Sequence, residues 1–253
     1  MRSIGLTALL LWSLPALAGD WRADLQVAVA AMDADLVAEV EAQTPTRTRA
    51  GFLRVIGPGW EDPALQPWYL EQVLDDDVDP AWQAAFAEQL ARQLVDEPSS
   101  PWHEAWVELA STHPEARVRE VLLTGLRHAP LALVEVGMVP ALRHEHAPTR
   151  RMAALEIGMS NEASLASEVR PLLDDADAGV RGNAARTLGI FKDAGAVAGL
   201  MGLLNDENGE VRLHALRAVH RIDALRAREL APALVNDSEA RVARLADKIV
   251  TGG

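Results

Sequence analysis

The chain contains no cysteine in its 253 residues. Disulfides, thiolate metal sites and cysteine nucleophiles are therefore excluded, and stability must come from packing alone. Several catalytic signatures are also missing: there is no G-x-S-x-G, no glycine-rich phosphate loop, no H-E-x-x-H and no strand pattern to carry such a site. These absences predict a binding protein without cofactors and not an enzyme.

Positive charge is scarce. The chain has 24 Lys and Arg against 37 Asp and Glu, for a net charge of −13. This balance argues against nucleic acid as a partner, because such binding depends on neutralising phosphates. The deficit is uneven: residues 20–100 carry a net charge of −11 and residues 101–253 a net charge of −3.

The chain has no apolar run long enough to span a membrane as a mature protein. Its first residues, MRSIGLTALLLWSLPALAGD, combine one Arg, an apolar run that Pro15 ends, and an A-x-A site before Gly19. This layout predicts a secretory signal peptide, residues 1–18, cleaved after Ala18. The expected location of the mature protein is the periplasm or beyond.

A pattern of charged and apolar residues recurs every 31 residues through the second half of the chain. Apolar residues lie five, nine and thirteen places after a loop residue, here called position zero, and four of the five copies have Arg at plus six. The zero positions are His113, His144, Asp175, Asp206 and Asp237. Apolar residues four apart share one helix face, and a second apolar run precedes each loop. Each copy therefore predicts two short helices, A and B, joined at position zero.

Two weaker copies precede these five. One has Asp77 at position zero, followed by Trp82, Phe86 and Leu90, and the other is the segment 44–57, which resembles 148–158. A helix pair cannot bury its apolar face alone, so neighbouring pairs must stack into a solenoid. The predicted domains are divergent, acidic and Trp-rich helical repeats over 19–100 and five regular repeats over 101–253.

The copy over 173–191 has Asp175 at position zero, Arg181 six residues later and A-x3-L-G over residues 184–189. In these features it resembles the HEAT repeat family, in its short bacterial, phycobilisome-lyase-type form. The resemblance implies an all-α, right-handed α-solenoid of about seven stacked antiparallel helix pairs. It also implies that the Arg of one repeat bonds the loop Asp of its own or the adjacent repeat, in a structural ladder formed by Asp175, Arg181, Asp206, Arg212 and Asp237. The ladder should be continuous only in the middle, since His113 and His144 stand at two zero positions and Ala243 replaces the last Arg.

Basic residues gather at plus seven and plus eleven of the B helices, away from the apolar stripe. They are Arg151, Arg186, Arg217, Arg244 and Lys248. In HEAT-like solenoids the B helices usually line the concave surface, so these residues predict a partner-binding face for a protein with an acidic segment. A solvated helix face is the alternative. Gly179, Gly182 and Gly189 are assigned to the same outer face.

Histidines, an acidic run and tryptophans elsewhere in the chain suggest alternative functions. His113, His144 and His146 would serve a helical enzyme or enzyme subunit, or hold a metal, although two of the three are loop residues that solvent can satisfy. The run 75–86 starts like a calcium loop but has Pro80 where Gly is needed, so helix capping explains its acids better. The Trp residues predict a bulky N-terminal core; alternatively Trp60, Trp68 and Tyr69 face solvent and bind an envelope polymer. The sequence specifies neither the partner's identity nor the oligomeric state.

Overall fold

The computed structural model describes residues 66–96 and 100–252, and every regular element in them is helical. The prediction of an all-α solenoid is therefore confirmed for this part of the chain. The predicted signal peptide and the first weak repeat, at 44–57, lie outside the described residues. The chain divides into two compact units between Trp102 and His103.

The described part of the first unit is one helix pair. Helices α5 (Gln66–Leu74) and α6 (Pro80–Asp96) are joined by the acidic loop 75–79. In this loop Asp75 Oδ1 accepts the backbone N–H of Asp77, and Asp79 Oδ1 accepts that of Ala81, both at 2.9 Å. The carboxylates thus cap the turn and the start of α6, and Pro80 occupies the first helical position, where no N–H is needed.

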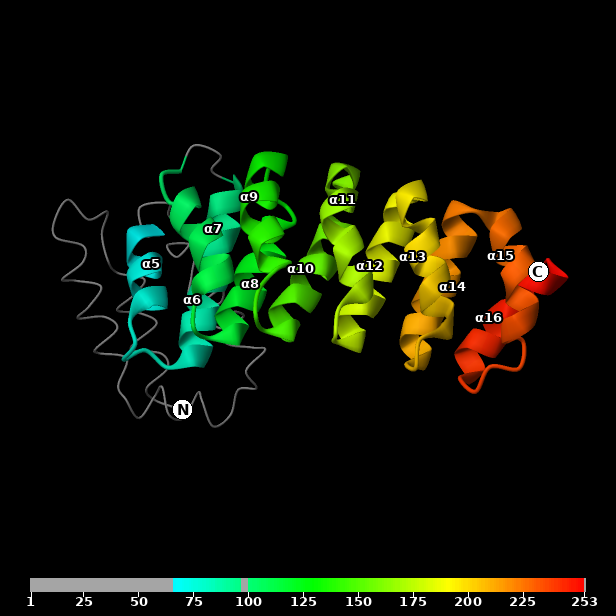
Figure 1. Ribbon diagram of the computed structural model, residues 1–253. Helices are drawn as coiled ribbons and strands as arrows, with labels where there is room; N and C mark the ends of the chain where they lie inside the picture. The colour runs from blue at the N-terminus through cyan, green and yellow to red at the C-terminus, as the bar shows by residue number, and fades with distance from the viewer. Residues whose placement is uncertain (1–65, 97–99, 253) are drawn as a thin grey trace, which may run out of the picture. The chain divides into compact units, whose positions relative to one another are not determined.

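The second unit contains five further pairs, which follow one another in order along the unit (Figure 1). The A helices are α7 (His103–Thr112), α9 (Leu131–Ala141), α11 (Ala166–Val169), α13 (Val197–Gly202) and α15 (Ala224–Leu230). The B helices are α8 (Ala116–Leu126), α10 (Ala147–Ser160), α12 (Ala178–Phe191), α14 (Gly209–Ile222) and α16 (Ala240–Thr251). The last three A helices continue as 3-10 turns, η5 (Arg170–Asp174), η7 (Leu203–Asn205) and η8 (Ala231–Leu234).

The predicted apolar stripe of the B helices forms the core within each pair. In α12 the residues at plus five, nine and thirteen, Val180, Ala184 and Leu188, have no exposed surface. Each large aliphatic side chain buried in this way contributes about 1.5–3 kcal/mol. The last copy departs from the pattern, because Val250 at plus thirteen is 48% exposed.

A second buried face joins each B helix to the next B helix in the unit. Helices α8, α10, α12, α14 and α16 pack consecutively. A Cβ atom on Gly189 of α12 would lie 2.8 Å from the backbone Cα of Ala218 in α14. One on Gly158 of α10 would overlap the hydroxyl oxygen of Thr187 in α12. Only glycine allows these helices to approach so closely.

The prediction that the glycines of α12 form part of its outer face was therefore wrong for two of the three. Gly182 and Gly189 are buried, and both face α14. Gly179 lies beside the side chain of Arg151 in α10. The residue seven places after position zero, also predicted to face outward, does not do so in every copy, because Leu213 of α14 occupies that position and is fully buried. The B helices carry two buried stripes, and the second one consists largely of small residues.

Candidate functional site

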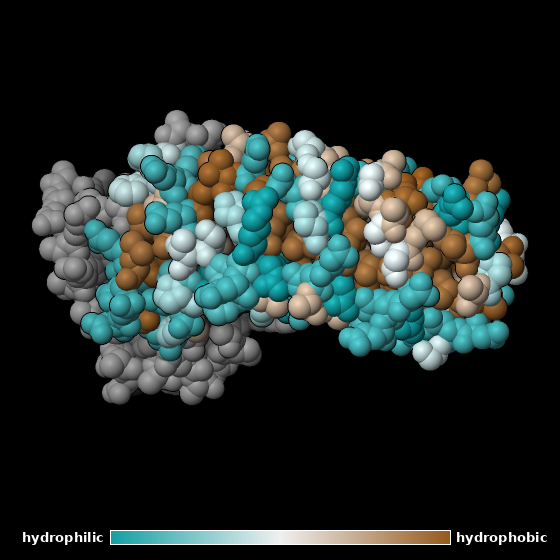
Figure 2. Space-filling view, in the orientation of Figure 1, coloured by the Kyte–Doolittle hydropathy of each residue, from teal (hydrophilic) through white to brown (hydrophobic). Residues whose placement is uncertain are grey.

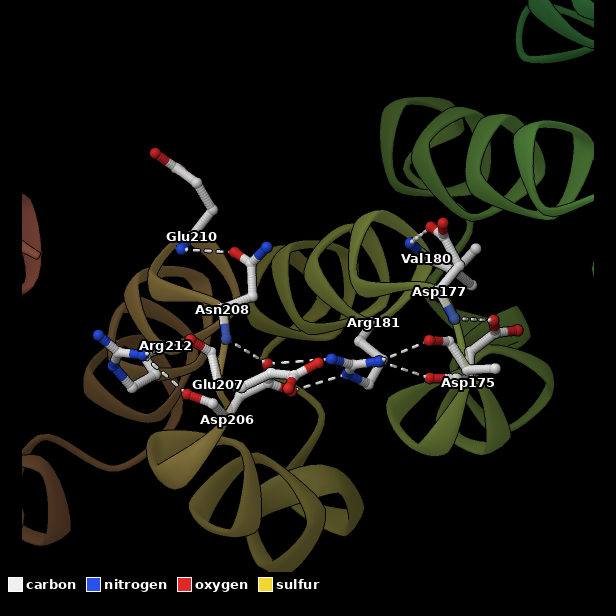
Figure 3. Close-up of polar contacts among 10 residues, drawn as sticks. Asp175, Asp177, Val180, Arg181, Asp206, Glu207, Asn208, Glu210 and Arg212 are labelled. Atoms are coloured by element: carbon white, nitrogen blue, oxygen red, sulfur yellow. Dashed lines mark hydrogen bonds and ion pairs between the residues drawn. The ribbon is translucent and has the colours of Figure 1, made fainter.

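The loops between A and B helices are tied to their neighbours by arginine. Arg181 donates from Nε to Asp206 Oδ2 at 2.7 Å and from Nη2 to Oδ1 at 3.0 Å, while its Nη1 donates to the backbone carbonyl of Asp175 at 2.8 Å (Figure 3). Arg212 bonds Asp237 and the carbonyl of Asp206 in the same way. Each guanidinium therefore joins its own loop to the loop of the following repeat.

The ladder extends one repeat further toward the N-terminus than the residues assigned to it from sequence. Arg150 of α10 forms the same two bonds with Asp175, at 2.7 and 2.8 Å. Hydrogen bonds from Arg150 hold the pKa of Asp175 below its usual range, although burial opposes them. Sequence reasoning missed Arg150 as a ladder residue, yet it stands at plus six of its copy, so the repeat register contained the signal.

These loops lie along one edge of α12, α14 and α16, where hydrophilic side chains gather in Figure 2. Each Arg–Asp pair of the ladder is here called a rung. The aspartates of the three rungs are nevertheless sheltered, with 6–8% of their side-chain surface exposed. The ladder is a structural joint and not an open site.

The rung before Arg150 has a different composition. Arg119 donates from Nε to the hydroxyl of Thr149 at 3.1 Å, because the next zero residue is His144 and offers no carboxylate. Residues at position zero also accept the backbone N–H of the residue two places on, and His144 does the same. Its Nδ1 accepts the N–H of His146 at 3.0 Å, as Asp175 Oδ1 accepts that of Asp177 at 2.9 Å. Arg119 is 3% exposed and has no carboxylate within ion-pairing distance in the described chain.

The three histidines singled out from sequence do not converge on one point. The rings of His144 and His146 lie 5.1 Å apart, whereas His113 is buried at its own loop, where its Nδ1 accepts the N–H of Glu115. Among the described residues no group of three His, Asp or Glu side chains could hold a metal ion. Nδ1 of both His113 and His144 is engaged by backbone, so neither ring offers that nitrogen to a ligand.

The five basic residues of the predicted partner-binding face are here called the basic strip. All five are exposed on their B helices: Arg151, Arg186, Arg217, Arg244 and Lys248. Within the described residues, ten arginines pair with a carboxylate, but no ion pair involves a strip residue. The other described cations without a carboxylate are Arg119, Lys192, Arg221 and Arg228. The strip is thus an exposed set of positive charges left uncompensated in an acidic protein.

His214 of α14, which sequence reasoning missed, lies among these charges. Its side chain is 24% exposed and packs over Gly182 of α12, whose added Cβ would lie 3.6 Å from the imidazole Cδ2. Burial lowers the pKa of His214, and the nearby Arg217 and Arg186 act in the same direction. Packing of α12 against α14 therefore brings the charges of Arg186 and Arg217 near the imidazole of His214.

A family model for HEAT repeats matches residues 135–219. These residues are HEAT repeats. They run from within α9 into α14, and thus include two complete Arg–Asp pairs of the ladder and three of the five exposed basic residues, Arg151, Arg186 and Arg217. The narrower assignment to the phycobilisome-lyase type stays a prediction, as does the handedness of the solenoid.

Two solved structures of engineered proteins are similar to this chain. One is 20% identical and covers 73% of this chain and 97% of its own, with a TM-score of 0.50; the other is 19% identical and covers 74% and 97%, with a TM-score of 0.51. Human deoxyhypusine hydroxylase in complex with glycerol is 17% identical over 83% of this chain and 82% of its own, with a TM-score of 0.39. At these identities the likeness concerns the fold alone. No curated protein sequence matches the chain.

The aromatic residues favour the core interpretation over the exposed one. Trp82 and Trp106 are 8% and 0% exposed, and Trp106 Nε1 donates to the carbonyl of Leu122 at 3.1 Å. Tyr69, assigned to a solvent-facing patch as an alternative, is fully buried, so that part of the alternative was wrong. Trp60 and the side chain of Trp68 lie outside the described residues. No described helix has the length and apolar character needed to cross a bilayer.

Proposed function

We propose that this chain is an exported HEAT-repeat scaffold that holds an acidic segment of a protein partner on the B-helix face of α12, α14 and α16. The HEAT-repeat fold itself suggests a protein-interaction or scaffold module. The observation that carries the finer proposal is the set of exposed cations without carboxylate partners, Arg186, Arg217, Arg244 and Lys248.

Charge distribution supports an acidic partner. Ten arginines of the described chain already have a carboxylate, whereas these four side chains remain available on successive helices. Opposite charge on a partner would steer its approach and fix its register, although each exposed pair adds at most about 1 kcal/mol. Several weak pairs in one row are therefore needed for useful affinity.

The ladder gives this face a fixed geometry. Arg181 and Arg212 clamp the loops from which α12 and α14 start, and Gly189 brings the two helices into close contact. A preorganised surface loses little conformational entropy when a partner binds. Export is proposed from the first 18 residues alone, which have the layout of a signal peptide.

The test is a triple charge reversal, Arg186→Glu, Arg217→Glu and Lys248→Glu, in the full chain. Capture of a partner from the exported protein fraction should be lost, and the partner identified from the wild type should carry an acidic segment. Helicity measured by circular dichroism should be unchanged, because none of the three side chains makes an ion pair.

The matched control is the triple variant Lys192→Glu, Arg226→Glu and Arg228→Glu. These side chains are exposed cations outside the strip, so the net charge changes by the same amount, and the one ion pair that is lost, between Arg226 and Glu229, is itself exposed. The control should bind like the wild type. Equal loss of binding in both variants would show that overall charge, and not this face, determines binding.

A further inference from the structure

One row of side chains runs across four consecutive B helices. Position plus eleven is Leu155 in α10, Arg186 in α12, Arg217 in α14 and Lys248 in α16. The three cations are exposed and Leu155 is partly exposed. Because the four helices pack one after another, the row is an apolar residue followed by three positive charges.

The spacing of this row follows from helix packing. Axes of packed helices lie about 8–10 Å apart, depending on the residues at the contact. Here Gly158 and Gly189 stand where a Cβ would overlap the next B helix, which allows close contact between α10 and α12 and between α12 and α14, whereas α14 has His220 at the equivalent position. Equivalent side chains on successive B helices therefore recur at roughly that spacing.

Few backbone conformations can place one carboxylate at each step of such a row. A β-strand sends alternate side chains to opposite faces, and two of its residues span only about 6.7 Å. An α-helix returns to the same face after seven residues, which span about 10.5 Å. A polyproline II helix has three residues per turn at about 3.1 Å each, so every third side chain points the same way at intervals of about 9.3 Å. This interval lies within the packing range.

We infer that the B-helix face binds a polyproline II segment of the partner in which a carboxylate recurs at every third residue, facing Arg186, Arg217 and Lys248. This inference rests on the proposed function and adds the conformation and sequence spacing of the ligand. Every cation of the row would then meet one carboxylate, without strain in the bound chain.

The row also specifies one end of the ligand. Beside Leu155, helix α10 carries Met152, which is partly exposed, and Met159, which is 50% exposed, while the exposed Arg151 of the same helix lies against Gly179 of α12. Methionine side chains adapt to apolar partners of different shape. The segment therefore has an apolar residue three places beyond its last carboxylate, on the side that lies over α10.

The test uses synthetic acidic peptides of equal length and composition, each with one apolar residue and three glutamates. The glutamates are placed at every second, every third or every seventh position, and binding to the full chain is measured by fluorescence anisotropy at low ionic strength. The every-third peptide should bind about tenfold more tightly than the others, since its carboxylates recur at an interval within the range of helix-packing distances. The Arg186→Glu, Arg217→Glu, Lys248→Glu variant should lose that preference, and the Lys192→Glu, Arg226→Glu, Arg228→Glu control should keep it.

The remaining outcomes separate this inference from the proposed function. Equal binding of all spacings that is lost in the strip variant would overturn the polyproline II register and leave the acidic-partner function standing. Tightest binding of the every-seventh peptide would overturn it in favour of a helical ligand. If no acidic peptide binds, or if binding survives in the strip variant, both the inference and the proposed binding face are wrong.

Discussion

Replacing Asp206 by Ala should destabilise the second unit more than an ordinary surface change. Asp206 accepts two hydrogen bonds from Arg181, at 2.7 and 3.0 Å, and one from the N–H of Asn208 at 2.8 Å. The side chains of Asp206 and Arg181 are only 7% and 12% exposed. Removing the carboxylate leaves the guanidinium with its carbonyl partners alone and removes the acceptor of a loop N–H.

The magnitude follows from these contacts. Hydrogen bonds to a charged group contribute about 1.5–3 kcal/mol each in net terms, and loss of one partner of a fully buried ion pair costs about 3–5 kcal/mol. Since some solvent reaches this rung, we expect a loss of about 2–4 kcal/mol for Asp206→Ala. The control is Asp174→Ala, at an exposed carboxylate one residue before the zero position of the preceding repeat, which should change stability by less than about 0.5 kcal/mol.

Urea unfolding followed by circular dichroism gives both values, and hydrogen exchange of α12 and α14 shows whether the effect is local, as expected for stacked repeats. A double-mutant cycle with Arg181→Ala should give a coupling of about 1–3 kcal/mol. The pKa of Asp206 is lowered in the folded chain, so its contribution is complete above the unfolded pKa of about 3.9 and is lost as the pH falls through the lower folded value. Equal stability of Asp206→Ala and Asp174→Ala, with no coupling, would refute the structural role of the rung.

Other predictions concern the joints between B helices and the rung without a carboxylate. Gly189→Ala should cost about 1–3 kcal/mol in urea unfolding because its Cβ meets the backbone of Ala218, whereas Gly202→Ala, with nothing within 4 Å, should be neutral or slightly stabilising. Burial lowers the pKa of His144, and the Arg119 charge adds to this, so wild-type stability should fall as the pH drops below about 6.5, where the unfolded chain takes up the proton first. His144→Asp should reduce that pH dependence, leaving the part that the lowered pKa of His214 contributes, and should stabilise the fold by about 1–3 kcal/mol by supplying Arg119 with a carboxylate; a destabilised variant would contradict this. Elemental analysis of the purified protein should find no stoichiometric metal, and a bound metal would instead favour a histidine site.

The sequence alone was sufficient for the helix pairs, because one apolar stripe with four-residue spacing repeats in register. It was not sufficient for the contacts between B helices. Those contacts use Gly158, Gly189 and Thr187, small residues whose burial leaves no hydrophobic period to detect. For this reason buried glycines were assigned to the outer face, and Leu213 shows that plus seven changes its environment from copy to copy.

The repeat period predicts where the ladder arginines lie, but it does not predict every residue to which they bond. The arginine positions follow from the period, but the partner of Arg119 does not, since the Thr149 hydroxyl accepts its hydrogen bond where His144 stands in place of a carboxylate. His214 could not be assigned either. Its surroundings depend on Arg186 and Arg217, which are brought together by the packing of α12 against α14.

Each repeat contacts the following one through equivalent residues, so one repeat can take the place of another. Arg150 and Arg181 each bond a carboxylate 25 residues ahead, Gly158 and Gly189 each contact a residue 29 ahead, and both kinds of contact recur after 31 residues. Excision of residues 175–205 would therefore bring Arg150 opposite Asp206 and Gly158 opposite Ala218, so that both kinds of joint form again across the cut. A chain built in this way can gain or lose whole repeats in evolution without redesign of its core, and each change would lengthen or shorten the cationic row by one step.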